Sequence, residues 1–294
     1  MSSLNDVNAT LDTIKAMRRQ EENGYVVTDY LSRIPAVKAL EAPVDLTCRQ
    51  MMAKWCCDIT DFCDYSRETA WIALNMLDRF MASRDGQSIL LVRNQFQLAA
   101  MAALYTAVKI HEHEAMDPNL VSTLSQGVHS PEAVEKMEFR MLNAIQWRVN
   151  PPTAMSFVRK MLELVPKGLI EQNEQKALME VTQMQLDLAS SDYDFCQRHA
   201  SHVALSAVLN AIESVSDDGM LHADFEETLS KVMEIKLSAI RDIRVRLYEE
   251  IHGTDDDLVY MQDTYDSAHE GKRVESFGNG SQGCIHKSPR SVSA

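Results

Sequence analysis

Histidine and glutamate alternate at His111-Glu112-His113-Glu114, and imidazole and carboxylate groups are common ligands of divalent metals. Alternating residues on a helix do not share a face, so these four side chains could not hold one metal ion together. The six cysteines stand at positions 48, 56, 57, 63, 196 and 284, and none forms a Cys-x-x-Cys pair. We therefore expect no metal, no cofactor, no catalytic residues and no disulfide framework, with the cysteines present as reduced thiols.

Two charged side chains fall among apolar helical positions. Arg49 has apolar residues one helical turn away in the segment 48–55, and Asp78 follows an apolar run that begins at Ala70. An unpaired buried charge is costly, so charges at core positions usually pair. We expect Arg49 and Asp78 to pair, while the alternative, in which both side chains reach solvent, stays open on this pattern alone.

A lysine and a glutamate occupy comparable positions further along the chain. Lys109 follows the apolar segment 98–108, where a cation would suit the carboxyl end of a helix dipole. Glu138 has apolar neighbours on its own helical face at Met141, Leu142 and Ile145. A solvated helix face would also accommodate Glu138, and the charge pattern alone does not decide between these interpretations.

The composition limits the class of protein. The chain of 294 residues carries 43 acidic and 29 basic side chains, giving a formal net charge of −14. Such a chain would be repelled by nucleic acids and anionic membranes, so we expect neither as a direct partner. The longest apolar stretch, 98–108, is too short to cross a bilayer, and the first residues lack the pattern of a secretory signal. We expect a soluble protein.

The elements that must position these residues are predicted to be helices. Long segments have helical periodicity and no strand-like alternation, and only 10 glycines and 8 prolines interrupt the chain. Shorter amphipathic stretches cover 11–19 and 25–39. Asn150-Pro151-Pro152 is a strong break, because proline removes a donor and disfavours helix in the residue before it. The expected helices are 46–62, 67–83, 93–111, 117–126 and 131–147 before this break, and 153–164, 171–190, 196–215 and 222–251 after it.

These segments predict an all-α protein of two helical bundles. We assign residues 1–45 to a helical N-terminal lead, 46–150 to a first bundle and 151–252 to a second bundle. Residues 253–294 are rich in Asp, Gly, Ser and Asn with few apolar anchors, which predicts a disordered tail.

Six motifs in order resemble the cyclin box, the domain of the regulatory subunits of cyclin-dependent kinases. Their order and spacing hold over roughly residues 46–153, with 29 residues from the family's lysine to its glutamate. The segment Arg198-His199-Ala200-Ser201, which opens an Ala-rich helix, resembles the second cyclin box. The motifs are Arg49-x-x-Met52-x-x-Trp55, Leu77-Asp78-Arg79-Phe80, Phe96-Gln97-Leu98-Ala99, Lys109, Lys136-Met137-Glu138-x-x-x-Leu142 and Trp147-x-x-x-Pro151-Pro152-Thr153.

The resemblance implies two tandem five-helix cyclin folds and a role for each matching residue. Lys109 and Glu138 match the pair that holds the backbone at the kinase's mobile regulatory helix, and Arg49 and Asp78 match the family's internal salt bridge. The apolar positions around the kinase contact are matched by Ile110, Leu142, Trp147 and Val149. The surface patch that docks Arg-x-Leu peptides is matched by Cys48, Met52, Trp55 and Gln97.

The chain departs from the family pattern at two places. Family members with a well-formed docking patch have Met and Leu where this chain has Cys48 and Met52. The usual Lys-aromatic-Glu-Glu is Lys109-Ile110-His111-Glu112 here. The short lead also favours a D-type-like or lineage-specific member over a mitotic one.

The function implied by the resemblance is that of a cyclin. Such a chain is not an enzyme itself; it binds and activates a cyclin-dependent kinase, in the nucleus and cytoplasm, to drive cell-cycle progression. Substrates or inhibitors that bear an Arg-x-Leu motif would be a further class of partner. The alternative is a cyclin-fold adaptor in transcription that activates no kinase, which would need a basic face if it bound DNA.

Overall fold

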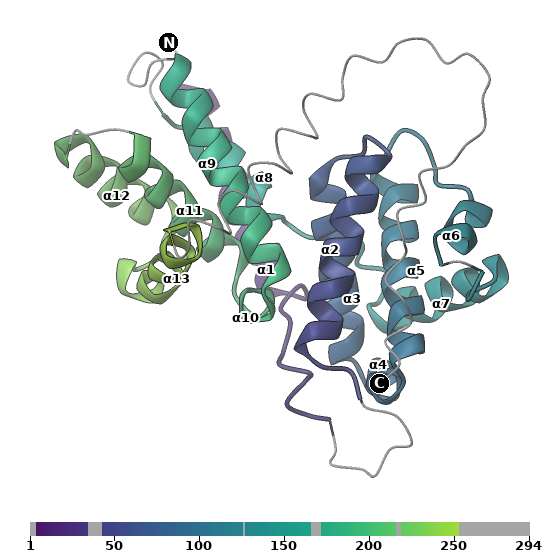
Figure 1. Cartoon of the computed structure of the whole chain (residues 1–294). Coiled ribbons are helices and arrows are strands. Elements are labelled where there is room, and N and C mark those ends of the chain that lie inside the picture. The colour runs from purple at the N-terminus through teal and green to yellow at the C-terminus, as the bar shows by residue number, and fades with distance from the viewer. Residues whose placement is uncertain (1–3, 35–42, 126, 166–171, 216–218, 253–294) are drawn as a thin grey trace.

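The computed structural model describes residues 4–34, 43–125, 127–165, 172–215 and 219–252, and the regular elements in these ranges are all helical. The predicted all-α class with two tandem bundles is confirmed. Figure 1 shows the two groups of helices side by side. The predicted disordered tail, 253–294, lies outside the described residues, and the domain ends at 45, 150 and 252 stay predictions.

The first bundle is built around its most buried helix, α5 (Arg93–His111). Residues 96–108 of α5 are buried, and the helix packs most extensively against α3 (Arg67–Ala82) and α7 (Pro131–Ala144). Polar caps begin the surrounding helices: Asp45 accepts from the Cys48 backbone N–H at 2.9 Å, and Ser130 caps α7. The remaining elements are α2 (Leu46–Phe62), α4 (Arg84–Gln87), the 3₁₀ turn η1 (Ile89–Leu91) and α6 (Pro118–Leu124).

The second bundle is organised in the same way around α11 (Ala200–Val215). Eleven residues of α11 are buried, and the helix packs against four neighbours in its own bundle. Thr153, directly after Pro151 and Pro152, caps the first of these neighbours along the chain, α8. The neighbours are α8 (Ala154–Glu163), α9 (Gln172–Ser191), α12 (Gly219–Met233) and α13 (Arg241–His252), with the short α10 (Tyr193–Cys196) and the 3₁₀ turn η2 (Leu237–Ala239) between them.

Helix α1 (Leu4–Glu22), at the start of the chain, packs against the second bundle. It contacts α8 and α12, and Ile14 is fully buried in the second bundle's core. The buried Glu21 carboxylate accepts the Ser201 backbone N–H at 3.0 Å and the Ser201 hydroxyl at 2.7 Å, so that it caps α11. The lead helix therefore completes the bundle that is more distant in the sequence.

Two predicted elements are wrong in detail. Residues 222–251 form two helices and a 3₁₀ turn instead of one helix, because Glu234 adopts a left-handed conformation (φ +52°) directly after α12. The Arg18 guanidinium donates to the Met233 carbonyl there, so a distant side chain stabilises the break. The stretch 25–39 is not helical over residues 25–34, and its remainder lies outside the described residues.

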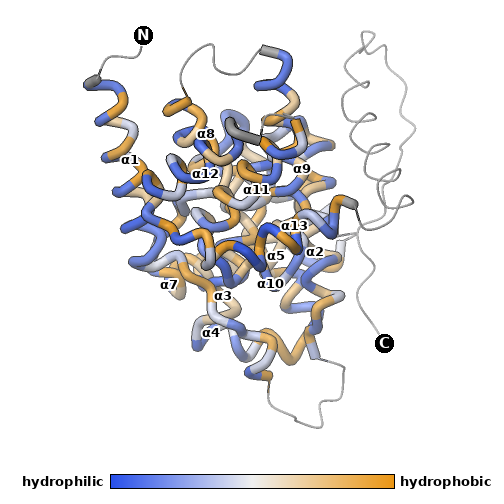
Figure 2. The backbone as a smooth tube through the Cα atoms, turned by 90° about the vertical axis from the view of Figure 1, so that its left-hand side faces the viewer, coloured by the Kyte–Doolittle hydropathy of each residue, from blue (hydrophilic) through white to orange (hydrophobic). Residues whose placement is uncertain are grey.

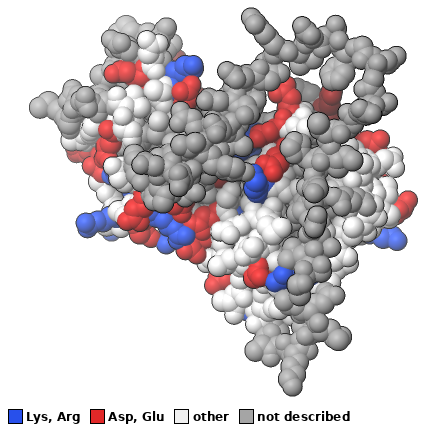
Figure 3. Space-filling view, in the orientation of Figure 1, with Lys and Arg blue, Asp and Glu red and all other residues white. Residues whose placement is uncertain are grey.

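The distribution of polarity agrees with amphipathic helices around apolar cores. Figure 2 shows hydrophobic and hydrophilic residues alternating along the helices. Acidic side chains predominate over basic ones on the face seen in Figure 3. Within the ranges given above, no helix has the length and apolar character needed to span a bilayer.

Candidate functional site

The structure brings Lys109 and Glu138 together at one end of the first bundle. Lys109 lies in the last turn of α5, and its Nζ is 3.0 Å from each carboxylate oxygen of Glu138 on α7. The Glu138 side chain is 10% exposed and also accepts from the Thr106 hydroxyl at 3.2 Å, whereas the Lys109 side chain is 48% exposed. The carboxylate is thus fixed by α5 while the ammonium group stays accessible.

Two of the four apolar residues assigned to this region are open to solvent. Ile110 is 44% exposed and Trp147 is 59% exposed, and large apolar side chains with such exposure are candidates for contact with another protein. Leu142 is buried, and the half-buried Val149 packs against the core of the first bundle. We call Lys109, Glu138, Ile110 and Trp147 the contact face.

A tight turn presents Trp147. Gln146 and Trp147 both adopt left-handed backbone conformations, with φ of +57° and +58°, directly after α7. Such conformations are costly for residues other than glycine and cluster at functional sites. The Trp147 backbone N–H donates to the Leu142 carbonyl at 2.8 Å, and the His111 ring Nε2 lies 3.1 Å from the Val149 carbonyl oxygen. These bonds hold the turn against α5 and α7.

Arg49 and Asp78 form a buried ion pair. Arg49 Nη2 lies 2.9 Å from Asp78 Oδ2, and both side chains are 2% exposed. Burial by itself would lower the pKa of Arg49, but the adjacent Asp78 carboxylate raises that pKa above its ordinary value. The Tyr30 hydroxyl donates to Asp78 Oδ1 at 2.8 Å and completes the carboxylate's surroundings.

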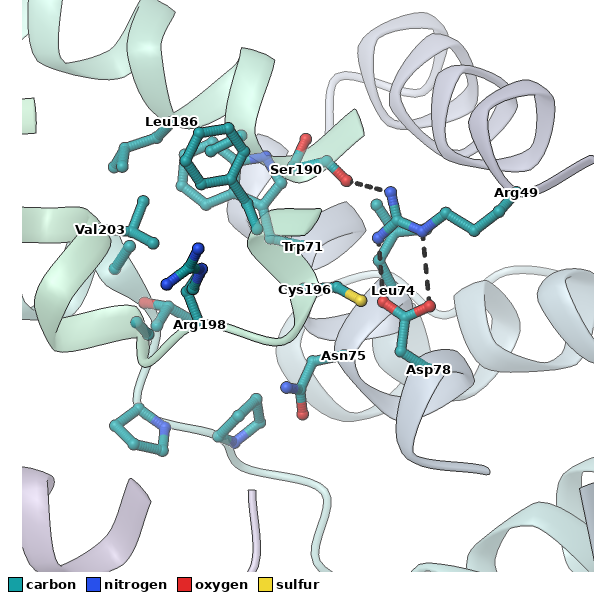
Figure 4. A pocket seen from close by; sticks show the side chains of 17 residues that line it. Arg49, Trp71, Leu74, Asn75, Asp78, Leu186, Ser190, Cys196, Arg198 and Val203 are labelled. Atoms are coloured by element: carbon teal, nitrogen blue, oxygen red, sulfur yellow. Dashed lines mark hydrogen bonds and ion pairs between the residues drawn. The ribbon is translucent and has the colours of Figure 1, made fainter. Parts of the chain in front are cut away.

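The same arginine also joins the two bundles. Its Nη1 donates to the carbonyls of Ser190, at 2.5 Å, and Ser191, at 3.0 Å, at the carboxyl end of α9. Figure 4 shows the guanidinium between Asp78 and Ser190, beside a cavity of about 130 Å³ between the bundles. The sequence motif predicts the partner on α3 but gives no indication of α9, because that contact depends on how the bundles pack.

The four residues assigned to peptide docking lie in the interior. Cys48, Met52, Trp55 and Gln97 are each at most 7% exposed, and the first three belong to the core of the first bundle. In this structure they do not form an open surface patch. Docking of Arg-x-Leu peptides at these residues stays a prediction.

No cluster in the part of the chain that the structure describes has three or more His, Cys, Asp or Glu side chains arranged to hold a metal ion. The five cysteines within the described ranges are free thiols. Burial raises the pKa of the Cys57 thiol to about 12, which disfavours the reactive thiolate.

Sequence reasoning missed two residues on the helices that carry Lys109 and Glu138. Thr106 interrupts the apolar run of α5, and this single hydroxyl proves to bind Glu138. Phe139, beside Glu138 in the sequence, is 63% exposed. The sequence offered one indication for each residue. Thr106 is an isolated polar residue in a buried helix, and Phe139 is an aromatic residue on the polar face of α7.

Comparisons with known proteins agree with this architecture. The family "Cyclin, N-terminal domain" matches residues 12–150, and "Cyclin, C-terminal domain" matches residues 152–277. Among solved structures, a viral cyclin from herpesvirus saimiri is similar with a TM-score of 0.58 and 16% identity, over 81% of this chain and 96% of that chain. A chain of the CAK complex of Chaetomium thermophilum gives a TM-score of 0.51 and 14% identity, over 95% of this chain and 94% of that chain.

Curated relatives are similar to this chain over only part of their own length. G2/mitotic-specific cyclin-2 of Medicago sativa is 27% identical over 57% of this chain and 48% of its own length. G1/S-specific cyclin-E1 of Rattus norvegicus is 24% identical over 49% of this chain and 35% of its own length. The chain thus spans about half or less of the length of these relatives. The two family matches together extend from residue 12 to residue 277, and the chain belongs to the cyclin family.

Proposed function

We propose that this chain is a non-catalytic regulatory subunit that binds and activates a cyclin-dependent serine/threonine kinase to drive cell-cycle progression. The contact face carries the proposal: a fixed carboxylate and an accessible ammonium group pair between α5 and α7, and an apolar side chain at the carboxyl end of each of these helices is exposed. A few polar anchors within an apolar surface suit the recognition of another protein's backbone and side chains.

The two charged groups could bind a partner without a large rearrangement. Glu138 is held by Thr106 and Lys109, so its oxygens are positioned before any partner arrives. Lys109 has solvent on one side and can exchange water for a backbone carbonyl of the kinase. Such preorganisation reduces the entropy lost on binding.

The mechanism is a shift in the kinase's conformational population. A free kinase holds its regulatory helix rotated outward, so that the helix glutamate cannot pair with the lysine that positions ATP. A cyclin that binds the inward position more tightly stabilises it and completes the phosphoryl-transfer site. The chemistry then belongs wholly to the kinase.

A further class of partner and a location in the cell extend the proposal. Substrates or inhibitors with an Arg-x-Leu motif are proposed as additional partners, which would require Cys48, Met52, Trp55 and Gln97 to become accessible. We also propose that the protein is present in the nucleus and cytoplasm, where a fluorescent fusion would show it. The names of the relatives include both mitotic and G1/S cyclins and support no single cell-cycle phase.

Co-purification tests the proposal. The full chain is expressed with candidate cyclin-dependent kinases and purified by a tag on this chain alone. An active kinase in the eluate is the expected result. Absence of every candidate kinase from a folded, soluble preparation would contradict it and would favour the adaptor function.

A further inference from the structure

Arg79 on α3 is a buried cation whose nearest partners are all uncharged. It is 7% exposed; its Nη1 donates to Asn75 Oδ1 at 3.1 Å and its Nη2 donates to the Arg148 carbonyl at 2.7 Å. Its guanidinium lies 4.5 Å from the centre of the Tyr25 ring. No carboxylate of a described residue lies within ion-pair distance of it.

Arg148 places a second cation beside the first. Its Nη1 donates to the Asn23 carbonyl, and the guanidinium occupies the space that a Cβ on Gly24 would need. Arg148 is exposed and, like Arg79, forms no ion pair within the described ranges. Burial together with the charge of Arg148 lowers the pKa of Arg79 to about 10.

This arrangement differs from that of the other partly or fully buried arginines. Each of those has at least one carboxylate partner, namely Asp78 for Arg49, Asp61 for Arg67, Asp45 for Arg93, Glu213 for Arg244, Asp192 for Arg246 and Glu22 for Arg18. Two arginines joined through the Arg148 carbonyl, neither of them paired with a carboxylate of a described residue, are unexpected in a chain with a net charge of −14. The missing anion would have to come from another molecule.

The position of the pair indicates which molecule this is. In the sequence, Arg148 lies between Trp147 and Val149. Trp147 belongs to the contact face, and the Val149 carbonyl is hydrogen-bonded to the His111 ring at the end of α5. We propose that Arg79 and Arg148 form an oxyanion site that binds a carboxylate or phosphate group of the kinase, an inference that rests on the proposed function. Arg148 makes the direct contact, and Arg79 positions it through the Arg148 carbonyl.

Measurements of kinase affinity test whether the kinase supplies the anion that binds this site. Arg148→Gln is expected to weaken binding of the co-purified kinase on the order of tenfold and to reduce the salt dependence of binding. Arg84→Gln, which removes an exposed arginine at the start of α4, is expected to bind as wild type does. Phosphatase treatment of the kinase separates the sources: affinity falls to the Arg148→Gln level if the group is a phosphate and is unchanged if it is a carboxylate.

A second measurement examines the site without the kinase. Inorganic phosphate is titrated into the free chain against chloride of equal ionic strength, with amide chemical shifts near Trp147 and Arg148 as the readout. Saturable shifts in wild type that are absent in Arg148→Gln support the site. No difference between the two proteins overturns it. Equal kinase affinity of Arg148→Gln and wild type, while the Lys109→Ala/Glu138→Ala variant fails to bind, overturns the inference and leaves the proposed function standing.

Discussion

Arg49 on α2 and Asp78 on α3 form an ion pair at 2.9 Å in which both side chains are almost fully buried. The remaining Arg49 donors reach two carbonyls at the carboxyl end of α9 in the other bundle. A cation at a helix carboxyl terminus also favours the helix dipole. One guanidinium therefore joins α2, α3 and α9, and its loss should affect both bundles.

Replacing this arginine should destabilise the fold severely. Arg49→Ala leaves the Asp78 carboxylate buried without its cation, and we expect the free energy of unfolding to fall by roughly 3–5 kcal/mol. Urea denaturation followed by circular dichroism measures this loss. Lys54→Ala on the same helix is the control, because its pair with Asp58 is exposed and should contribute about 0.5 kcal/mol or less. A variant Arg49→Ala as stable as the control would contradict the account.

Gly86 should tolerate no side chain. A Cβ at Gly86 would overlap the Phe80 carbonyl oxygen and approach the Met81 Cα to 2.7 Å, both of which are backbone atoms that cannot rotate away. Gly86→Ala is therefore expected to cost about 1–3 kcal/mol of stability or more. Gly127→Ala is the matched variant: nothing lies within 4 Å of its Cβ, so only its left-handed conformation (φ +76°) opposes the change. The prediction fails if thermal melts show the two variants to be equally stable.

Asp187 should make stability depend on pH. Burial raises the pKa of its carboxyl to about 6, despite the Arg67 guanidinium 3.6 Å away, and nearby Asp61 acts in the same direction as burial. An unfolded Asp titrates near 3.9, so between these values the folded state binds more protons and loses stability as pH rises. The unfolding free energy of Asp187→Asn, measured relative to that of wild type, should therefore rise by on the order of 3 kcal/mol between pH 3.5 and 7.

The comparison requires only urea denaturation of the two proteins across this pH range. The constant effect of the substitution itself cancels in the slope. A difference in unfolding free energy that does not change with pH would show that the pKa of Asp187 is the same in the folded and the unfolded chain, contrary to the effect of its burial.

The long helices of the first bundle could be predicted because local physics determines them. The predicted ranges 46–62 and 93–111 match α2 and α5, where continuous apolar periodicity begins directly after a polar or extended residue. The two-bundle organisation followed from Pro151 and Pro152. Helix α4 was missed because four residues are too few to show periodicity.

The errors arise where distant contacts override the local pattern. The apolar stripe of 222–251 continues through the break after Met233, and only Arg18 from α1 and the conformation of Glu234 end the helix there. Residues 25–34 have amphipathic spacing, but the Tyr193 hydroxyl accepts the backbone N–H groups of Tyr30 and Leu31 and holds them in a non-helical path. No sequence window of helical length contains both partners.

Candidate site residues were predicted from motifs, and their exposure was not. The spacing of Lys109 and Glu138 indicates a pair, whereas the burial of Leu142 and the openness of Trp147 depend on the turn after α7. Burial of Cys48 and Met52 likewise depends on how α2 packs in the first bundle.

The most direct measurement is histone phosphorylation by the kinase that co-purifies with this chain, compared between wild type and the Lys109→Ala/Glu138→Ala variant. Truncating both anchors should cost about 2–5 kcal/mol of kinase binding, because desolvated polar contacts are lost. The fold should be retained, because Lys109 is half exposed, removing both partners leaves no unpaired buried charge, and the apolar core side chains are untouched. We predict an active kinase with wild type and background phosphorylation with the double variant, at equal helical content by circular dichroism. Equal kinase recovery and activity with the double variant would contradict the central claim.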